Sequence, residues 1–456
     1  VVTLHDVIRI LKDGRIVKEI EYKDANGDST SAGGSKTDQI AFSLDNRLMF
    51  IAGTLGDIHV LDTATMQLGR SFSVGTTNIS SLAVSGQWLY VAEGSYHDPN
   101  GNYRLLRVNI DTSSAEFLQV QQIDLPRDVS GTNAPFGYID MAMTNGVHSY
   151  LAVTASKQSL GLSTGRPSSD SGNVFILDLD ASQVIGGRLN AAEAGAFLKV
   201  DFPEGQGKAP QFIASAGIKD NTLRLVLSDA LDKDAGLATI TVGLTDKGQM
   251  EGSARFNRIA MLGALPGMSR LDGKYQLNVQ RAQSPAVVVA PNGTEYALVA
   301  DHYFDILDPL TWNDDAGNGA RQMGGKIGII KDPFGPRPEY LGATSPIIDA
   351  NFSRLLVSSD GTTLSADIRY WPTIDNVPPP SGLLVWDLPK LIEAAERNSL
   401  AKQASPRPLP IDQQLLAGTV HQVVTPTKYE LGEAGNFMSG WVVGMAESLL
   451  KKPDSV

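Results

Sequence analysis

Five aspartates crowd one short stretch of the chain, between residues 301 and 325. Ca²⁺ prefers about six to eight oxygen ligands, which carboxylates, amides and backbone carbonyls supply. Solvated polar turns have the same composition, so the stretch fits either a calcium site or ordinary turns. If calcium binds here, its candidate ligands are Asp301, Asp305, Asp308, Asp314 and Asp315.

Two motifs match the letters of catalytic or metal-binding sequences without the structure that such chemistry needs. Gly161–Gly165 reads Gly-Leu-Ser-Thr-Gly, the pattern of a nucleophile elbow, which works only on a sharp strand-to-helix turn. The residues around it are polar and predict a loop. Asp24–Asp28 begins like an EF-hand loop, but Ser29 and Ser35 replace the Gly and the bidentate Glu of that loop. The sequence therefore predicts no catalytic residue, and it indicates an Asn-Gly turn at the second motif.

The six histidines have no spacing of two or four residues that would place a pair on one side of a strand or helix. A zinc site would need ligands that the fold brings together from distant positions. His97 and His302 fall in comparable insertions, which leaves a joint site between them as an alternative. No phosphate-binding glycine motif occurs, so nucleotide chemistry has no support.

A repeated pattern of strands must position these residues. Each copy has an apolar strand, a turn, a second apolar strand, a variable loop and a third strand. The third strands end at Asp62, Asp111, Asp178, Asp332 and Asp387, and the strand Leu237–Leu244 takes this place without an Asp. Units of about 40–50 residues plus loops fit four-stranded propeller blades. The sequence therefore predicts an all-β fold, a β-propeller of four-stranded antiparallel blades.

Six units can be identified directly, and the termini offer a seventh. We expect a single domain over residues 1–456 whose ring closes when N-terminal strands, about 1–22, pair with C-terminal strands, about 411–447. Seven blades result if this pairing forms, and six if it does not. An Asp N-cap, an early Pro and one apolar stripe predict a helix at about 388–403, and Ala181–Leu189 is a weaker helix candidate.

One copy of the pattern resembles a known family. Ser43–Ala52 followed by Ile58–Thr65 is similar to the YVTN repeat of surface-layer-type β-propellers, with Leu44 in place of the usual Pro and Asn46 in place of the usual Gly. The close match covers about Ile40–Phe72, and the rest of the chain matches only in the spacing of its repeated strands. The resemblance implies a propeller fold and leaves function open, because propellers have unrelated activities.

The long insertions fall mostly between the second and third strands of a unit. In a propeller these connections emerge on one face, and loops held by a rigid scaffold are the usual carriers of binding. The insertions are Gly94–Tyr103, Lys157–Gly172, Ser228–Gly236, Asp301–Gly325 and Ser365–Gly382. Aromatic side chains there are typical of a recognition surface. The candidate binding residues are Tyr96, His97, Tyr103, His302, Tyr303, Trp312, Tyr370 and Trp371.

Composition excludes several classes of function. The chain has 456 residues, 38 Lys and Arg against 50 Asp and Glu, and a net charge of −12, which disfavours nucleic-acid binding. It contains no cysteine, which excludes disulfides, thiol nucleophiles and Cys-ligated metals and suits an exported protein. No apolar run approaches the roughly 18 residues of a membrane span. The chain starts without Met in a strand-like segment, so we expect a mature chain or part of a larger polypeptide.

These observations favour a non-catalytic binding or scaffolding module of a secreted or cell-surface bacterial protein. It would recognise a protein or glycan, as in adhesion, through the loops of one face. Two alternatives stay open. The first is a lactonase-like hydrolase with a metal in the central channel, and the second is a structural spacer.

Overall fold

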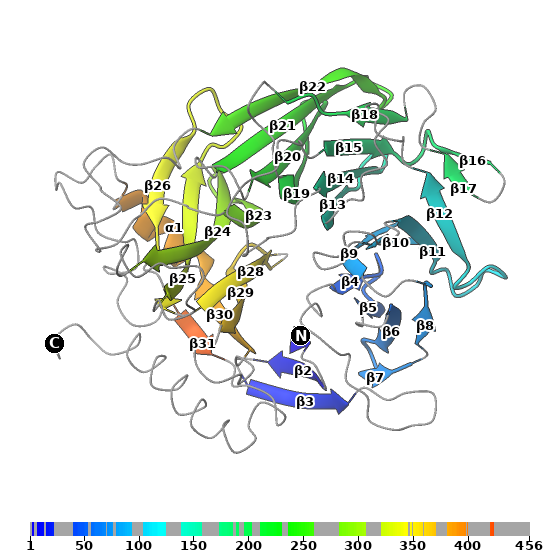
Figure 1. Cartoon of the computed structure of the whole chain (residues 1–456), viewed down its shortest axis with the longest axis horizontal. Coiled ribbons are helices and arrows are strands. Elements are labelled where there is room, and N and C mark those ends of the chain that lie inside the picture. The colour runs from blue at the N-terminus through cyan, green and yellow to red at the C-terminus, as the bar shows by residue number, and fades with distance from the viewer. Residues whose placement is uncertain are drawn as a thin grey trace, which may run out of the picture. The chain divides into compact units, whose positions relative to one another are not determined.

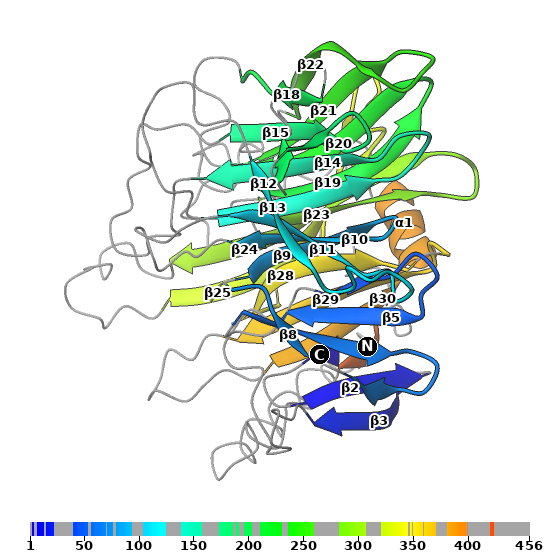
Figure 2. The ribbon, with the colours of Figure 1, turned by 90° about the vertical axis from the view of Figure 1, so that its right-hand side faces the viewer.

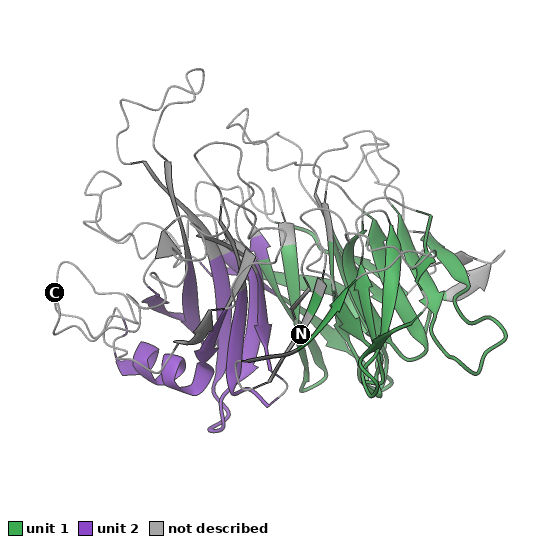
Figure 3. Cartoon of the chain, turned by 90° about the horizontal axis from the view of Figure 1, so that it is seen from below, with its two compact units in different colours: residues 1–227, 240–256 green, residues 228–239, 257–456 purple. Residues whose placement is uncertain are grey.

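The computed structural model describes residues 2–3, 7–12, 15–21, 40–52, 56–69, 71–75, 79–93, 104–124, 138–156, 173–185, 188–190, 196–202, 210–229, 236–259, 282–306, 321–344, 347–348, 350–358, 360–370, 381–397, 399 and 420–423. The chain divides into two compact units, coloured separately in Figure 3. Unit 1 contains residues 1–227 and 240–256, and unit 2 contains residues 228–239 and 257–456.

Four sheets of four antiparallel strands follow one another along unit 1. The first sheet consists of β4 (Ile40–Phe42), β5 (Leu48–Ala52), β6 (Asp57–Asp62) and β7 (Gln67–Leu68), and the second of β9 (Ile79–Ser85), β10 (Trp88–Glu93), β11 (Leu105–Asn109) and β12 (Val120–Asp124). The third sheet consists of β13 (Tyr138–Thr144), β14 (Tyr150–Ser156), β15 (Asn173–Asp178) and β18 (Phe197–Lys199), and the fourth of β19 (Pro210–Lys219), β20 (Thr222–Asp229), β21 (Gly236–Leu244) and β22 (Met250–Ile259). The ends of β20, β21 and β22 fall in the residue ranges of unit 2. β8 (Phe72–Ser73) also pairs with β6. Figure 2 shows β13, β14 and β15 side by side.

Two further sheets of the same kind make up most of unit 2. Their strands are β23 (Ala282–Val289), β24 (Glu295–Ile306), β25 (Arg321–Lys331) and β26 (Glu339–Ala343), then β28 (Ala350–Val357), β29 (Thr363–Tyr370), β30 (Ser381–Asp387) and β31 (Val420–Val423). β27 (Ile347–Ile348) also pairs with β25. In all six sheets the strands that lie side by side follow in chain order (Figure 1). This is the blade of a β-propeller, so the predicted fold class is confirmed in its six-bladed form.

The predicted strands at the N-terminus are present. β1 (Val2–Thr3), β2 (Val7–Lys12) and β3 (Arg15–Glu21) pair with one another in a three-stranded sheet. At the other end, β31 pairs with β30. The expected strand near residues 441–445 lies outside the described residues, and closure of one domain by pairing of the two termini stays a prediction.

The strand β10 is apolar from Trp88 to Ala92 because both of its faces are buried. Side chains alternate between the faces of a strand, and in β10 Leu89 and Val91 pack toward the first sheet, whereas Tyr90 and Ala92 pack toward the third. The strand therefore has no polar face, which is typical of sheets that are covered on both sides.

Side chains of the innermost strands join neighbouring sheets in register. The Ser81 hydroxyl of β9 donates to Asp140 Oδ1 of β13 at 3.1 Å. Four residues later in β9, the Ser85 hydroxyl donates to Asn145 Oδ1 at 2.7 Å. The two strands thus run in the same direction, and the two sheets have the same orientation. Asp140 Oδ2 also accepts the backbone N–H of Ile213 in β19, at 3.0 Å. One fully buried carboxylate therefore ties three sheets of unit 1 together.

The helix predicted at about 388–403 is confirmed as α1 (Leu388–Arg397), and residues 398 and 400–403 lie outside the described part. Asp387 Oδ1 accepts the backbone N–H of Lys390 at 3.1 Å, which is an N-cap. The predicted apolar stripe is buried in the core of the last two sheets, with Leu388, Leu391 and Ala395 fully covered. Among the described residues no helix is long and apolar enough to cross a membrane.

The second helix candidate, Ala181–Leu189, is wrong. These residues form a hairpin of β16 (Gln183–Ile185) and β17 (Arg188–Asn190), and β17 extends the second sheet by pairing in parallel with β12. Two glycines, Gly186 and Gly187, separate the strands in the sequence. Glycine disfavours a helix interior and favours a tight hairpin, which accounts for the difference from the prediction.

Three of the expected insertions are shorter than predicted, and the smallest change is at Ser228–Gly236, where β20 and β21 leave 230–235. β24 and β25 pair as far as Ile306 and Arg321, so the connection is 307–320 rather than Asp301–Gly325. β29 runs to Tyr370 and β30 begins at Ser381, which reduces Ser365–Gly382 to 371–380. Aromatic and β-branched residues such as Tyr303 and Ile306 favour strands, and the hairpin continues past Asp301 and Asp305.

Candidate functional site

The predicted binding and calcium-binding residues are placed only in part. His302, Tyr303, Asp301 and Asp305 lie on the far half of β24, where His302 is opposite Gly325 and Tyr303 is opposite Gly324, and Tyr370 ends β29. The remaining candidates lie outside the described residues; they are Tyr96, His97, Tyr103, Trp312, Trp371, Asp308, Asp314 and Asp315. The binding surface and the calcium site therefore stay predictions, as do the loops at Gly161–Gly165 and Asp24–Asp28.

The connection end of a sheet is the end at which its second strand leaves and its third strand returns. Five of the six second-to-third connections are long, namely 94–104, 157–172, 230–235, 307–320 and 371–380, whereas the first sheet has only 53–56. Where sheets of one unit share their orientation, their connections emerge at the same end. The strand order thus confirms that the insertions fall between second and third strands.

An ion pair closes the base of one long connection. Arg104 Nε lies 2.7 Å from Glu93 Oε2, and a second guanidinium nitrogen of Arg104 donates to the carbonyl of Gly75 at 2.6 Å. Gly75 belongs to the link between the first and second sheets. The connection and the sheet-to-sheet link therefore meet at one end, as the propeller pattern requires.

The turn end, where first strands meet second strands and third strands meet fourth strands, is built from repeated hydrogen bonds. In the turn Ser43–Leu48, Asp45 Oδ1 accepts the Ser43 hydroxyl at 2.6 Å and the Arg47 N–H at 3.1 Å. In the turn Ser358–Thr363, Asp360 accepts the Ser358 hydroxyl at 2.6 Å and the Thr362 N–H at 3.0 Å. These bonds lower the pKa of Asp45, and they lower that of Asp360 to about 2.

The aspartates that end the third strands cap the following turn. Asp62 Oδ1 accepts the N–H groups of Ala64 and Thr65 at 3.0 and 2.8 Å, and Asp111 Oδ1 accepts the N–H of Ser113 at 2.9 Å. The hydrogen bond from the Thr65 backbone lowers the pKa of Asp62, and the Ser113 hydroxyl lowers that of Asp111. The recurrent Asp in the sequence is thus a structural cap rather than a catalytic group.

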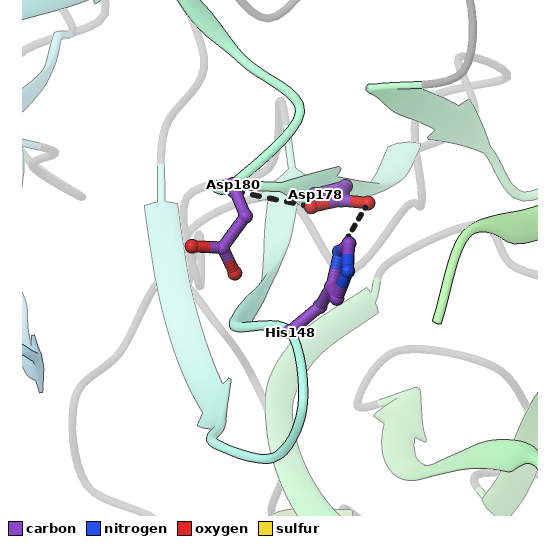
Figure 4. A group of neighbouring side chains, drawn as sticks. All are labelled: His148, Asp178 and Asp180. Atoms are coloured by element: carbon purple, nitrogen blue, oxygen red, sulfur yellow. Dashed lines mark hydrogen bonds and ion pairs between the residues drawn. The ribbon is translucent and has the colours of Figure 1, made fainter. Parts of the chain in front are cut away.

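At the third sheet the same position has additional neighbours (Figure 4). Asp178 Oδ1 accepts the N–H groups of Asp180 and Ala181, both at 3.1 Å, while its Oδ2 lies 3.4 Å from His148 Nδ1. Asp180 Oδ2 accepts the backbone N–H of Ser149 at 2.6 Å. The ligand atoms of His148, Asp178 and Asp180 all lie within 4.8 Å of one another. Asp178 is buried, His148 is half-buried and Asp180 is exposed.

The fourth sheet holds the His148 ring in place. Gly248 lies directly against it, since a Cβ added at Gly248 would come within 2.8 Å of the imidazole carbon Cδ2. The Tyr150 hydroxyl donates to the Gly248 carbonyl, and the rings of Tyr150 and His148 stack with centroids 6.4 Å apart. Burial raises the pKa of Tyr150 to about 12, with a further contribution from the charges of Asp178 and Asp180.

The sequence analysis did not identify this group. His148 has no nearby histidine in the sequence and stands 30 positions before Asp178, so residue spacing gives no signal. The repeat does provide one, because it places a first turn and a third-strand end of the same sheet side by side. A His in the first and an Asp-x-Asp in the second are then neighbours. The buried His59, in contrast, belongs to the first sheet, and its burial lowers its pKa.

Comparisons with known proteins identify no family for this chain beyond the fold that the strand order already shows. No protein-family model matches the sequence, and no curated protein matches it. Among solved structures, one of U3-55K covers 81% of this chain and 85% of its own, with 13% identity and a TM-score of 0.44. A structure of RRP9 WD40 repeats covers 77% of each chain with 15% identity and a TM-score of 0.42. A chain of a mitotic checkpoint complex covers 75% and 78% with 12% identity and a TM-score of 0.40. The class assigned here, a six-bladed β-propeller, rests on the sheets themselves.

Proposed function

We propose that the chain is a non-catalytic binding or scaffolding module that recognises a protein through the long connections at the connection end. The observation that carries the proposal is the position of the five long connections, all between second and third strands. Chain length varies at that end from 53–56 to 157–172, whereas the first-to-second turns at the turn end all stay short. The third-to-fourth connections at the turn end also vary, and the last of them, 388–419, contains α1. Variable loops on a rigid scaffold are the usual place for recognition.

Aromatic residues supply the anchors in this proposal. Trp and Tyr bury much area at little entropic cost, and they often dominate binding energy. Trp312 and Trp371 fall in the sequences of two long connections of unit 2, and Tyr370 ends the strand that leads into one of them. No catalytic residue is part of the proposal, since no motif in the sequence supplies one.

The experiment compares two double variants. Immobilised full chain is used to capture proteins from secreted and cell-surface extracts, and a glycan array is screened in parallel. We expect Trp312→Ala with Trp371→Ala to abolish capture of a protein partner while the circular dichroism spectrum stays unchanged. The control is Glu393→Gln with Arg397→Gln, which removes an exposed pair 3.9 Å apart on α1, at the turn end. Loss of capture in the control alone would contradict the proposal.

Other outcomes of the same screen would change the ligand class. Specific hits on the glycan array alone would replace the protein ligand by a glycan. The absence of any ligand in both screens would favour the spacer alternative. The secreted or cell-surface location and the YVTN-repeat relationship belong to this proposal as well. The lack of cysteine supports the first, and the resemblance over Ile40–Phe72 supports the second.

A further inference from the structure

We propose that His148, Asp178 and Asp180 bind a divalent transition-metal ion of the Zn²⁺ type at the turn end of the third sheet. The group combines one imidazole nitrogen with two carboxylates, which is a common set of zinc ligands. Ca²⁺ would require more oxygen atoms than the group provides. Among the described residues, it is the one group of three such side chains close enough to share an ion.

The separation of the first two ligands fits a shared ion better than a direct ion pair. Charge-assisted hydrogen bonds between nitrogen and a carboxylate are about 2.7–2.9 Å long. His148 Nδ1 and Asp178 Oδ2 are 3.4 Å apart. Two ligand atoms that each lie about 2.0–2.1 Å from a tetrahedral Zn²⁺ ion are separated by about 3.3–3.4 Å. The pair therefore already has the spacing of two ligands on one ion.

Backbone hydrogen bonds fix the position of both carboxylates. Asp178 uses Oδ1 for the two backbone N–H groups that follow it and directs Oδ2 toward His148. Asp180 uses Oδ2 for the Ser149 N–H, and its Oδ1 has no partner among the described residues. Outer hydrogen bonds of this kind orient metal ligands and strengthen binding. Asp180 is exposed to solvent, whereas Asp178 is buried, so an ion from solvent would reach Asp180 first.

The neighbouring repeat supplies a natural control. Asp111 lies two residues after the third strand of the second sheet and also caps the following turn, through the Ser113 N–H and hydroxyl. It belongs to no described group of three metal-ligating side chains. Removing its charge changes the cap and leaves the proposed metal ligands intact.

The experiment titrates chelator-treated full chain with Zn²⁺ alone, followed by isothermal titration calorimetry and by the thermal unfolding midpoint. We expect one ion per chain and a higher unfolding midpoint, because an ion that binds the folded chain stabilises it. Asp180→Asn and His148→Gln should weaken the affinity at least about tenfold, whereas Asp111→Asn should leave it unchanged. Co²⁺ in place of Zn²⁺ should give the absorption spectrum of nitrogen and oxygen ligation.

Asp180→Asn keeps the proposal testable if His148→Gln fails to fold. Its amide oxygen still accepts the Ser149 N–H, and the side chain is exposed, so the fold should persist. Equal Zn²⁺ affinity in the wild type and Asp180→Asn would overturn the proposal. The absence of stoichiometric binding to the wild type would overturn it as well.

Discussion

In the first-to-second turns of the sheets the chain reverses within a few residues, and the same hydrogen bonds recur in the first and the last sheet. At the connection end the lengths range from residues 53–56 in the first sheet to 157–172 in the third. The turns Ser43–Leu48 and Ser358–Thr363 share their acceptor, their donors and a left-handed residue, Asn46 or Gly361. Local chemistry thus determines these turns, whereas the second-to-third connections vary in length. We therefore expect stability to depend on the strands and on these turns, and recognition to depend on the connection end.

The largest loss of stability is expected from Asp140→Ala, which breaks the link between neighbouring sheets. Asp140 is fully buried and accepts the Ser81 hydroxyl and the Ile213 N–H. Its removal leaves buried donors without their acceptor, which should lower the free energy of unfolding by about 3 kcal/mol. Urea denaturation of the two proteins measures the change. An unchanged midpoint would show that this carboxylate does not hold the sheets together.

A smaller loss is expected from Asn46→Val at the turn end. Asn46 has a φ of 56°, a left-handed conformation that β-branched residues strongly avoid. The substitution should cost about 1–2 kcal/mol. Asn46→Gly, which restores the residue usual in the YVTN repeat, should stay within about 0.5 kcal/mol of the wild type. Equal stability of the Val and Gly variants in urea would show that the conformation of this turn is not required.

The pH dependence of one turn gives a third and smaller effect. Hydrogen bonds from Ser358 and Thr362 lower the pKa of Asp360 to about 2, from an ordinary value of 3.8. The carboxylate therefore stabilises the folded chain above the ordinary value, and this contribution disappears as the pH falls through about 2. The urea midpoints of the wild type and Asp360→Asn should differ at pH 6 and converge on acidification toward pH 2. A difference that does not depend on pH would rule out the charge as its source.

The strand pattern could be predicted from the sequence because it depends on local signals. Apolar strands that end at Asp62, Asp178 and Asp387 mark third strands, and all of them occupy that position in their sheets. The capping role of Asp387 and the start of α1 follow from the same local chemistry. At Ala181–Leu189 the weaker helix candidate was wrong, because Gly186 and Gly187 favour the hairpin that forms.

The group at His148 could not be found from spacing, because its ligands meet only through the pairing of strands. His148 precedes β14, Asp178 ends β15, and Gly248 comes from the turn of another sheet. Such contacts between distant positions depend on sheet register, which periodicity does not specify. The extended hairpin of β24 and β25 was missed for a related reason, since the aspartates in its sequence also suit turns.

Backbone deuterium exchange of the free and the partner-bound chain shows where a partner binds. We expect binding to protect the strand ends that flank the long connections, such as Glu93, Arg104 and the β24 residues His302–Ile306. The turns Ser43–Leu48 and Ser358–Thr363 should exchange at the same rate in both states. Protection confined to those turns, with no change beside the long connections, would contradict the account.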